Sequence, residues 1–161
     1  KYNLSQTRRY AGIMDALSEA NVPVSNVRQI DYHTVFGSPV PSTSSYKSYE
    51  ELFFPVDYTA VIGFNDLQSY SAMEILKERG YRIPEDISLI SFDHLRKTHT
   101  YLPPLTSVAD NTDKSIADTA VSILLNKIKN LDSKFTGAVL PVTIYDGHTT
   151  GPVNKAFETS F

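Results

Sequence analysis

Apolar positions along the chain follow two patterns, short continuous runs and stripes with helical spacing. The runs at residues 60–64 and 87–92 lack clean polar alternation, as expected of strands buried on both faces of a parallel sheet. Residues 105–109 and 139–145 have the composition of further short strands, and residues 27–32 predict a weaker one. The strand content is therefore spread over the whole chain.

Helical spacing marks three other segments. The first predicted helix covers residues 6–20, with Ser5 as its expected N-cap. A second begins at Asp66 and ends before Gly80, which suits a left-handed C-terminal cap. A third covers residues 113–130. The expected apolar stripes are Tyr10, Ile13, Met14 and Leu17; Leu67, Tyr70, Met73 and Leu76; and Ile116, Ala120, Val121, Leu124, Leu125 and Ile128.

A loop at residues 34–45, rich in Gly, Pro and hydroxyl side chains, separates the first helix from a short helix at residues 46–53. Loops of that length in compact domains are often functional. The alternation of strands and helices along the chain predicts a three-layer α/β/α domain with a mainly parallel sheet and right-handed crossovers.

Composition narrows the class of protein. The chain has 161 residues, 41% of them hydrophobic and 20% charged, as in a soluble globular domain with one core. It has no cysteine, which excludes disulfides and thiolate metal sites. A formal net charge of -3 argues against this segment binding a phosphate backbone by itself. No window resembles a membrane span.

Polar residues follow two of the predicted strands. Asn65 comes after the run at 60–64, and Asp93 comes after the run at 87–92. Small ligands of open α/β sheets bind beyond the carboxyl ends of the strands, so these groups are candidates for contacting ligand hydroxyls. Each has a structural alternative. Asn65 could cap the helix that follows, a role open to Asp66 as well, and Asp93 could be held by backbone amides.

Other chemistries lack their motifs. His33, His94, His99 and His148 show no HExxH or paired-ligand spacing, which argues against a metal site. A GxSxG elbow, a P-loop and a GxGxxG loop are all missing from the sequence, which weakens hydrolase, nucleotidyl-transfer and dinucleotide-cofactor interpretations. The sequence therefore predicts no metal, no cofactor and no catalysis.

Five motifs occur in a characteristic order. They are Asn65-Asp66, Gly80, Pro84-Glu-Asp-Ile-Ser88, Phe92-Asp93 and Pro103-Pro-Leu-Thr-Ser-Val108. Together with Arg9-Tyr-Ala-Gly12 upstream, this series resembles the effector-binding domain of lactose-repressor/galactose-repressor (LacI/GalR) transcriptional regulators. The resemblance covers residues 5–150, and the order of the motifs makes it more specific than any one of them.

The resemblance implies a periplasmic-binding-protein-like lobe. Residues 1–150 would form the C-terminal lobe of a two-lobed sensor, and residues 151–161 a tail. The 113–130 helix would belong to the N-terminal lobe of an intact member. We expect it here to dock against a neighbouring chain or to fold back onto its own lobe. Operator DNA would be bound by a helix-turn-helix that this chain lacks.

The resemblance also assigns site residues. Arg9 matches the family's sugar-contacting arginine, whose guanidinium reads vicinal hydroxyls, and Asp93 would accept hydrogen bonds from the same hydroxyls. His94 departs from the Asp or Asn that often follows in the family. Thr112 lies with Asp110 at a later crossover between lobes. The predicted ligand-binding residues are Arg9, Tyr32, Phe36, Asn65, Asp93 and Asp110, in which Tyr32 and Phe36 would be aromatic platforms or, alternatively, core anchors.

The implied function is a cytoplasmic repressor that senses a small-molecule effector, commonly a sugar or sugar derivative, and acts as a homodimer without membrane contact. Tyr46, Tyr49, Tyr70 and Tyr101 fall in elements with which the family dimerises, although tyrosines also cover a lobe's own core. Three alternatives stay open. They are a periplasmic sugar-binding protein of a transporter, an enzyme using Asp93 with a histidine, and a regulator with a corepressor-binding surface.

Overall fold

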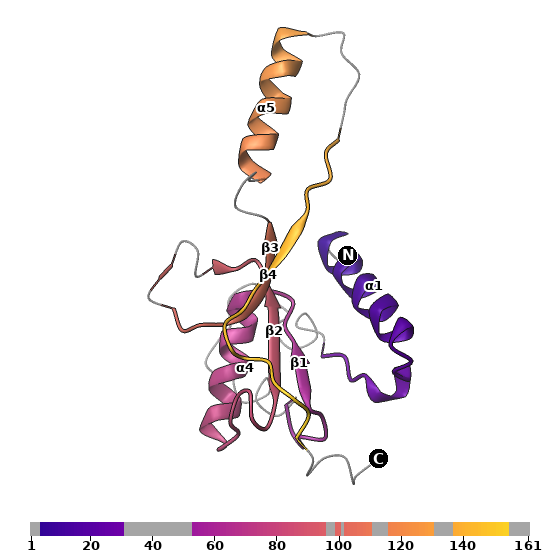
Figure 1. The fold of residues 1–161 in the computed structure, drawn as a ribbon, viewed down its shortest axis with the longest axis vertical. Coiled ribbons are helices and arrows are strands. Elements are labelled where there is room, and N and C mark those ends of the chain that lie inside the picture. Colours follow the sequence, from indigo (N-terminus) through magenta and orange to yellow (C-terminus); the bar gives the residue numbers. More distant parts are fainter. Residues whose placement is uncertain are drawn as a thin grey trace. The chain divides into compact units, whose positions relative to one another are not determined.

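The computed structural model describes residues 4–30, 53–95, 99–100, 102–110, 116–130 and 137–154 (Figure 1). The chain divides into two compact units, Lys1–Asp57 and Tyr58–Phe161. Among the described residues, the first unit contains one long helix, and the second contains the sheet. Each unit is described by itself below.

The first unit is built on α1 (Leu4–Glu19), followed by the short helix η1 (Val24–Asn26). Because α1 begins at Leu4, Ser5 lies inside its first turn, and its prediction as the N-cap is wrong. The helix ends at Glu19, and Asn21 beyond it is a left-handed residue with φ 57°. Asn21 N–H donates to the Ser18 carbonyl and Val22 N–H to the Leu17 carbonyl, the paired bonds of a Schellman motif.

After η1 the chain is held by Arg28. Its guanidinium donates to the backbone carbonyls of Phe53 and Pro55 and lies 3.3 Å from the Asp57 carboxylate. A planar guanidinium with several N–H donors can bind these carbonyl and carboxylate groups at the same time. The strand predicted at residues 27–32 is not formed over residues 27–30, and the other two positions lie outside the described residues.

The second unit contains a four-stranded sheet. Its strands are β1 (Ala60–Ile62), β2 (Ser88–Phe92), β3 (Thr106–Asp110) and β4 (Val142–Tyr145), in the order β1-β2-β3-β4. The first two pairings are parallel and the last is antiparallel (Figure 1). The predicted mainly parallel α/β sheet is confirmed.

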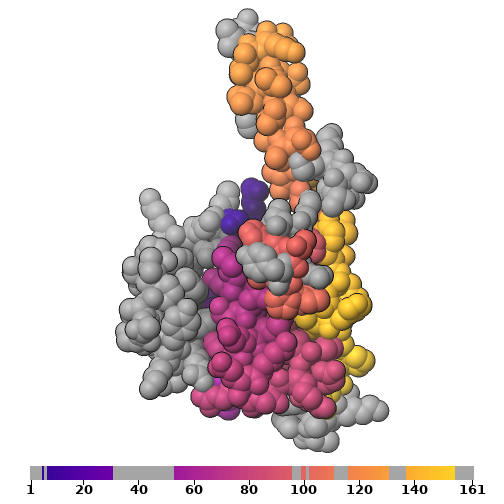
Figure 2. Space-filling model, turned by 90° about the vertical axis from the view of Figure 1, so that its left-hand side faces the viewer, coloured from indigo at the N-terminus to yellow at the C-terminus, as the bar shows by residue number. Residues whose placement is uncertain are grey.

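Helix α4 (Asp66–Glu78) packs on this sheet. Met73 of the helix, Leu89 of β2 and Leu105 before β3 form a buried cluster. Gly80, with φ 86°, ends α4 through bonds from Gly80 N–H to the Lys77 carbonyl and from Tyr81 N–H to the Leu76 carbonyl, which confirms the predicted left-handed cap. The outer side of α4 is visible in Figure 2, in magenta.

Two expectations about burial are wrong. Leu67, placed on the apolar stripe of α4, is 64% exposed, and Asp66 and Ser69 lie on the buried face instead. Residues Ala60 and Ile62 of β1 are exposed, whereas Val61 between them points to the other face of the sheet and packs against the buried cluster. The two-sided burial predicted from the apolar run holds better for β2, where Leu89 is fully buried.

Helix α5 (Ile116–Lys129) has no buried residue. Its large apolar side chains are between 50% and 62% exposed, namely Ile116, Val121, Leu124, Leu125 and Ile128. The expectation that this helix folds back onto its own lobe is therefore wrong, whereas docking against another chain stays a prediction. Among the described helices, none combines the length and apolarity needed to cross a membrane.

Candidate functional site at the carboxyl edge of the sheet

Three of the predicted ligand-binding residues follow neighbouring parallel strands. Asn65 comes three residues after β1, Asp93 directly follows β2, and Asp110 is the last residue of β3. Because β1, β2 and β3 run parallel, their carboxyl ends meet at one edge of the sheet. The structure therefore brings these three positions to the same edge.

Asn65 is the N-cap of α4. Its backbone is extended, and its side-chain Oδ1 accepts a hydrogen bond of 2.9 Å from Gln68 N–H. Its carbonyl oxygen accepts from Ser69 Oγ at 3.0 Å. The capping alternative is confirmed for Asn65. Capping uses the amide oxygen, and the Nδ2 group is a separate donor, so the cap is chemically compatible with a ligand contact.

Asp66 has a different role from the cap suggested by sequence. Its side chain is 1% exposed. One carboxylate oxygen accepts from Ser107 Oγ at 2.7 Å, and the other accepts from Leu95 N–H at 2.6 Å. Ser107 Oγ in turn accepts from His94 N–H at 2.9 Å. These bonds connect the start of α4, the turn after β2, and β3.

The turn after β2 has an unusual backbone. Asp93 and His94 both have positive φ, 97° and 51°, a conformation that is uncommon for residues other than glycine. Asp93 N–H donates to the Val108 carbonyl at 2.9 Å, and its side chain is exposed. The His94 ring stacks on Tyr145, with 3.9 Å between ring centroids and 11° between planes. The departure from the family pattern at His94 thus produces an aromatic contact with β4.

Asp110 contributes to local structure. Its Oδ2 accepts from Ile116 N–H at 3.3 Å, at the first residue of α5, and its backbone carbonyl accepts from Tyr145 Oη at 2.9 Å. These bonds give Asp110 a structural role, and its ligand contact stays a prediction.

None of the other predicted site residues is described within the unit that carries this edge. Arg9 lies on α1, partly buried, in the first unit. Tyr32, Phe36 and Thr112 lie outside the described residues, as do Tyr46, Tyr49 and Tyr101. The convergence of Arg9 with Asn65 and Asp93 on one crevice stays a prediction. Among the described residues, no group of three or more His, Asp or Glu side chains is placed to hold a metal ion.

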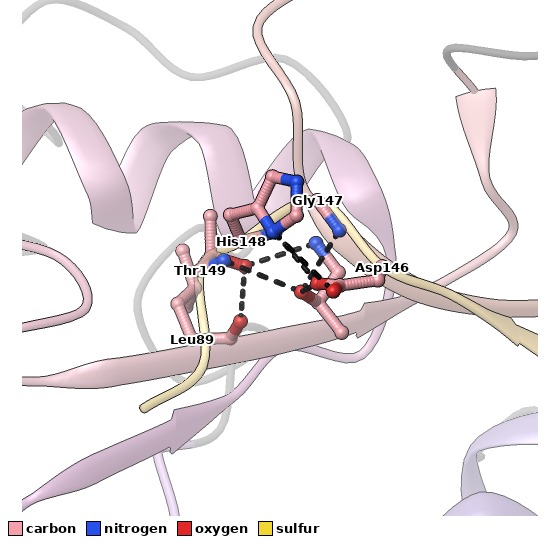
Figure 3. Close-up of polar contacts among 6 residues, drawn as sticks. Leu89, Asp146, Gly147, His148 and Thr149 are labelled. Carbon is pink, nitrogen blue, oxygen red and sulfur yellow. Dashed lines mark hydrogen bonds and ion pairs between the residues drawn. The ribbon is translucent and has the colours of Figure 1, made fainter. Parts of the chain in front are cut away.

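A second buried polar network lies at the opposite, amino edge of the parallel strands (Figure 3). Thr149 Oγ1 donates to the Leu89 carbonyl at 2.6 Å and accepts from Thr106 N–H at 2.9 Å. Thr106 Oγ1 accepts from the N–H groups of Gly147 and Thr149. A Cβ on Gly147 would lie 2.2 Å from the Leu105 carbonyl carbon, so this approach requires glycine.

The Pro84-Glu-Asp-Ile-Ser88 motif lies at the amino edge, where Asp86 makes several hydrogen bonds. Asp86 accepts from the Arg82 backbone N–H at 2.8 Å and from two guanidinium nitrogens of Arg82 at 2.8 and 2.7 Å. These hydrogen bonds from Arg82 hold the pKa of the Asp86 carboxyl well below its usual range. Asn154 Nδ2 donates to the same carboxylate at 3.1 Å. The motif thus forms a closed turn that leads into β2.

Sequence reasoning missed the buried roles of Asp66, Ser107 and Thr149. A weak signal was present, since Ser91 and Ser107 interrupt otherwise apolar strands. The hydroxyls of Ser91, Ser107 and Thr149 bond to partners 13 to 60 residues away in sequence, as in the 2.8 Å bond between Ser69 Oγ and Ser91 Oγ. A single sequence does not specify such pairs.

Residues 3–150 match the model of the periplasmic binding protein-like domain. The chain belongs to this family. Among curated relatives, the HTH-type transcriptional repressor PurR of Aliivibrio salmonicida is 36% identical over 123 residues, which are 76% of this chain and 35% of the relative. PurR of Mannheimia succiniciproducens is 30% identical over 128 residues, 79% of this chain and 36% of that protein. This domain thus spans about a third of the length of the curated relatives it matches.

Solved structures agree with the fold of this periplasmic binding protein-like chain. A LacI family transcriptional regulator from Enterococcus faecium with bound ribose matches with a TM-score of 0.69 at 24% identity, covering 92% of this chain and 52% of that one. CcpA of Lactococcus lactis matches with a TM-score of 0.65 at 25% identity, covering 92% and 52%. The resemblance to LacI-type effector domains is confirmed. The curated relatives are transcriptional repressors, which are not enzymes.

Proposed function

We propose that this chain is the effector-sensing part of a LacI-type transcriptional repressor and that it binds a sugar or sugar derivative at the carboxyl edge of its sheet. The observation that carries the proposal is the placement of Asn65 and Asp93 after neighbouring parallel strands, with Asp93 exposed. Repressors among the relatives and a ribose-bound neighbour of the same fold support it.

The chemistry of the edge suits a polyol. The Asp93 carboxylate accepts hydrogen bonds from two hydroxyls, and the Asn65 amide adds a donor. In the proposed complex Arg9 is a further hydrogen-bond donor. Tyr32, Phe36 and Asp110 are further proposed contacts. In this proposal the site binds the effector and does not convert it.

Sensing requires a ligand that binds two conformations with different affinity. In the proposed regulator, the effector stabilises one arrangement of two lobes and so changes how a homodimer presents its DNA-binding heads. Operator DNA is contacted by a helix-turn-helix outside this chain. The protein would act in the cytoplasm. This chain would supply the C-terminal lobe of that sensor.

The test is a thermal-shift screen of the full-length protein against sugars and sugar phosphates. A compound present at about 100 times its Kd stabilises the folded state by about 2.7 kcal/mol. Asp93→Asn removes the charge while keeping the size of the side chain, and we expect a loss of about 1.5–3 kcal/mol in binding. Asp15→Asn, at an exposed position of α1, is the matched control and should bind like wild type. A screen without any stabilising compound would contradict the proposal.

Arg9 provides a second test in the full-length repressor. Arg9→Ala should abolish the response to the compound found in the screen and leave operator affinity near that of wild type. Arg9→Lys keeps the charge and loses the planar fork, so it should restore little of the response. Induction of Arg9→Ala equal to wild type would exclude Arg9 from the site.

A further inference from the structure

The buried carboxylate of Asp66 has partners that its position in α4 does not explain. Asn65 already caps the helix through Gln68 N–H, so Asp66 is free of that task. A carboxylate at 1% exposure is unfavourable unless its oxygens are hydrogen-bonded. Both oxygens are bonded, to Leu95 N–H at 2.6 Å and to Ser107 Oγ at 2.7 Å. The first helical residue is also where the helix dipole favours a negative charge.

Both bonds converge on the turn that carries Asp93. Leu95 is two residues beyond Asp93, and its N–H is held by Asp66 directly. The N–H of His94, the residue between them, is held by Ser107 Oγ, whose own proton points to Asp66. The two amides that follow Asp93 are therefore fixed by one carboxylate, one of them through a serine.

This turn needs to be held. Asp93 and His94 are consecutive residues with positive φ, a conformation that persists at non-glycine positions only where the surroundings impose it. If the turn relaxed to negative φ, the direction in which the Asp93 side chain leaves the backbone would change. Contact with a ligand depends on that direction, since hydrogen bonds weaken steeply with misalignment.

We propose that Asp66 is a positioning residue, which holds the left-handed turn at Asp93 and His94 and thereby presents the Asp93 carboxylate at the edge of the sheet. Because Asp66 follows Asn65 directly, the same two hydrogen bonds tie the loop of Asn65 to the loop of Asp93. The significance of this positioning for effector binding rests on the proposed function; the turn itself does not.

The test is amide hydrogen exchange by NMR on the complete chain, without any ligand. Asp66→Ala should accelerate exchange at His94 and Leu95 by about 10–100-fold and shift the backbone resonances of Asp93 and His94 towards those of negative φ. Asp66→Asn can still accept from Leu95 N–H and donate to Ser107 Oγ. This variant should restore most of the protection and the resonances.

Thr149→Val is the matched control, because it removes another buried polar bridge from the opposite edge. It should accelerate exchange at Thr106 and leave His94 and Leu95 unchanged. Ser107→Ala tests the second half of the network and should affect His94 more than Leu95. It also serves if Asp66→Ala does not fold.

Two results would overturn the proposal. One is unchanged exchange at His94 and Leu95 in Asp66→Ala. The other is a uniform increase throughout β2 and β3, which would assign Asp66 to general stability of the sheet. An effector screen without hits would count against the proposed function and would leave these ligand-free measurements decisive for the turn.

Discussion

The two edges of the sheet both contain buried polar networks, and they use them differently. At the carboxyl edge, Asp66 and Ser107 are buried while Asp93, on the turn they hold, is exposed. At the amino edge, Thr106 and Thr149 are 3% and 6% exposed, and their hydroxyls bond to one another's backbone and to Leu89. The first network holds the turn that carries an exposed side chain. The second joins β2, β3 and the segment after β4 through buried groups only.

The difference shows how one sheet can present an exposed side chain at one end and bury its polar groups at the other. Buried hydrogen bonds that satisfy each other contribute rigidity, and the amino edge contains Gly147 in contact with backbone. At the carboxyl edge the backbone adopts disfavoured φ values, as is common where a structure holds functional groups. The comparison predicts that substitutions at the amino edge affect stability most and those at the carboxyl edge affect binding most.

The largest expected effect is at Gly147. A Cβ there would approach Leu105 backbone atoms to within 2.2–2.5 Å, and backbone cannot move aside as a side chain can. Gly147→Ala should lower the free energy of unfolding by about 3 kcal/mol, measured by urea denaturation. The control is Gly12→Ala in α1, where nothing lies within 4 Å of the added Cβ. That variant should gain about 1 kcal/mol from helix propensity.

Thr149→Val should have the next largest effect on stability. The substitution keeps the shape and leaves Thr106 N–H and the Leu89 carbonyl without the Thr149 hydroxyl. An unsatisfied buried polar group costs about 1–3 kcal/mol. Thermal unfolding with Thr149→Ser as the comparison checks this, since serine retains the hydroxyl. Equal stability of the valine and serine variants would show that the hydroxyl is not what closes this edge.

At the carboxyl edge the backbone itself can be tested by comparing two variants of Asp93. Both Asp93→Gly and Asp93→Ala lose the carboxylate, so they should bind the effector equally poorly. Glycine accepts φ 97° without a Cβ penalty, and the glycine variant should be more stable than the alanine variant by about 1 kcal/mol. Chemical denaturation of the two proteins measures the difference. Alanine at least as stable as glycine would mean that the turn is not strained.

The smallest expected effect is a pH dependence of stability that arises from Asp86 at the amino edge. The pKa of Asp86 is lowered in the folded protein by its bonds to Arg82, so the unfolded chain binds a proton more readily. This contribution is complete above the unfolded value of about 3.9 and is lost as the pH falls below it towards the folded pKa. Arg82→Gln should raise the pKa of Asp86, as measured by NMR titration. It should also weaken the dependence of the unfolding free energy on pH below about pH 4.

Local sequence signals predicted the elements of the sheet well. Gly80 specified the end of α4, and the apolar run at 87–92 located β2, because each depends on neighbouring residues alone. The signal failed where burial depends on tertiary position. Leu67 is apolar and exposed, Ala60 and Ile62 of β1 are exposed, and residues 27–30 contain no strand despite their composition.

The candidate site was predicted in part. Asn65 and Asp93 were located because a residue that follows a parallel strand lies at the carboxyl edge whatever the details of packing. The supporting residues were not found, because Asp66 contacts Ser107 from 41 positions away in sequence. Helical spacing also favoured an apolar buried face on α4. Asn65 is the cap, because the Asp66 carboxylate is bonded to Leu95 and Ser107. Those tertiary contacts are not visible in the local sequence.

The bond between Thr149 and Leu89 joins residues 60 positions apart, which has a consequence for synthesis. Strand β2 leaves the ribosome well before the segment that completes its hydrogen bonding. At about 5–20 residues per second the interval is roughly 3–12 s. During that time the amino end of β2 offers unpaired backbone groups to other strands. The nascent chain therefore has a period in which the hydrogen bonding of β2 is incomplete, and a slow codon tract between the two segments would lengthen it.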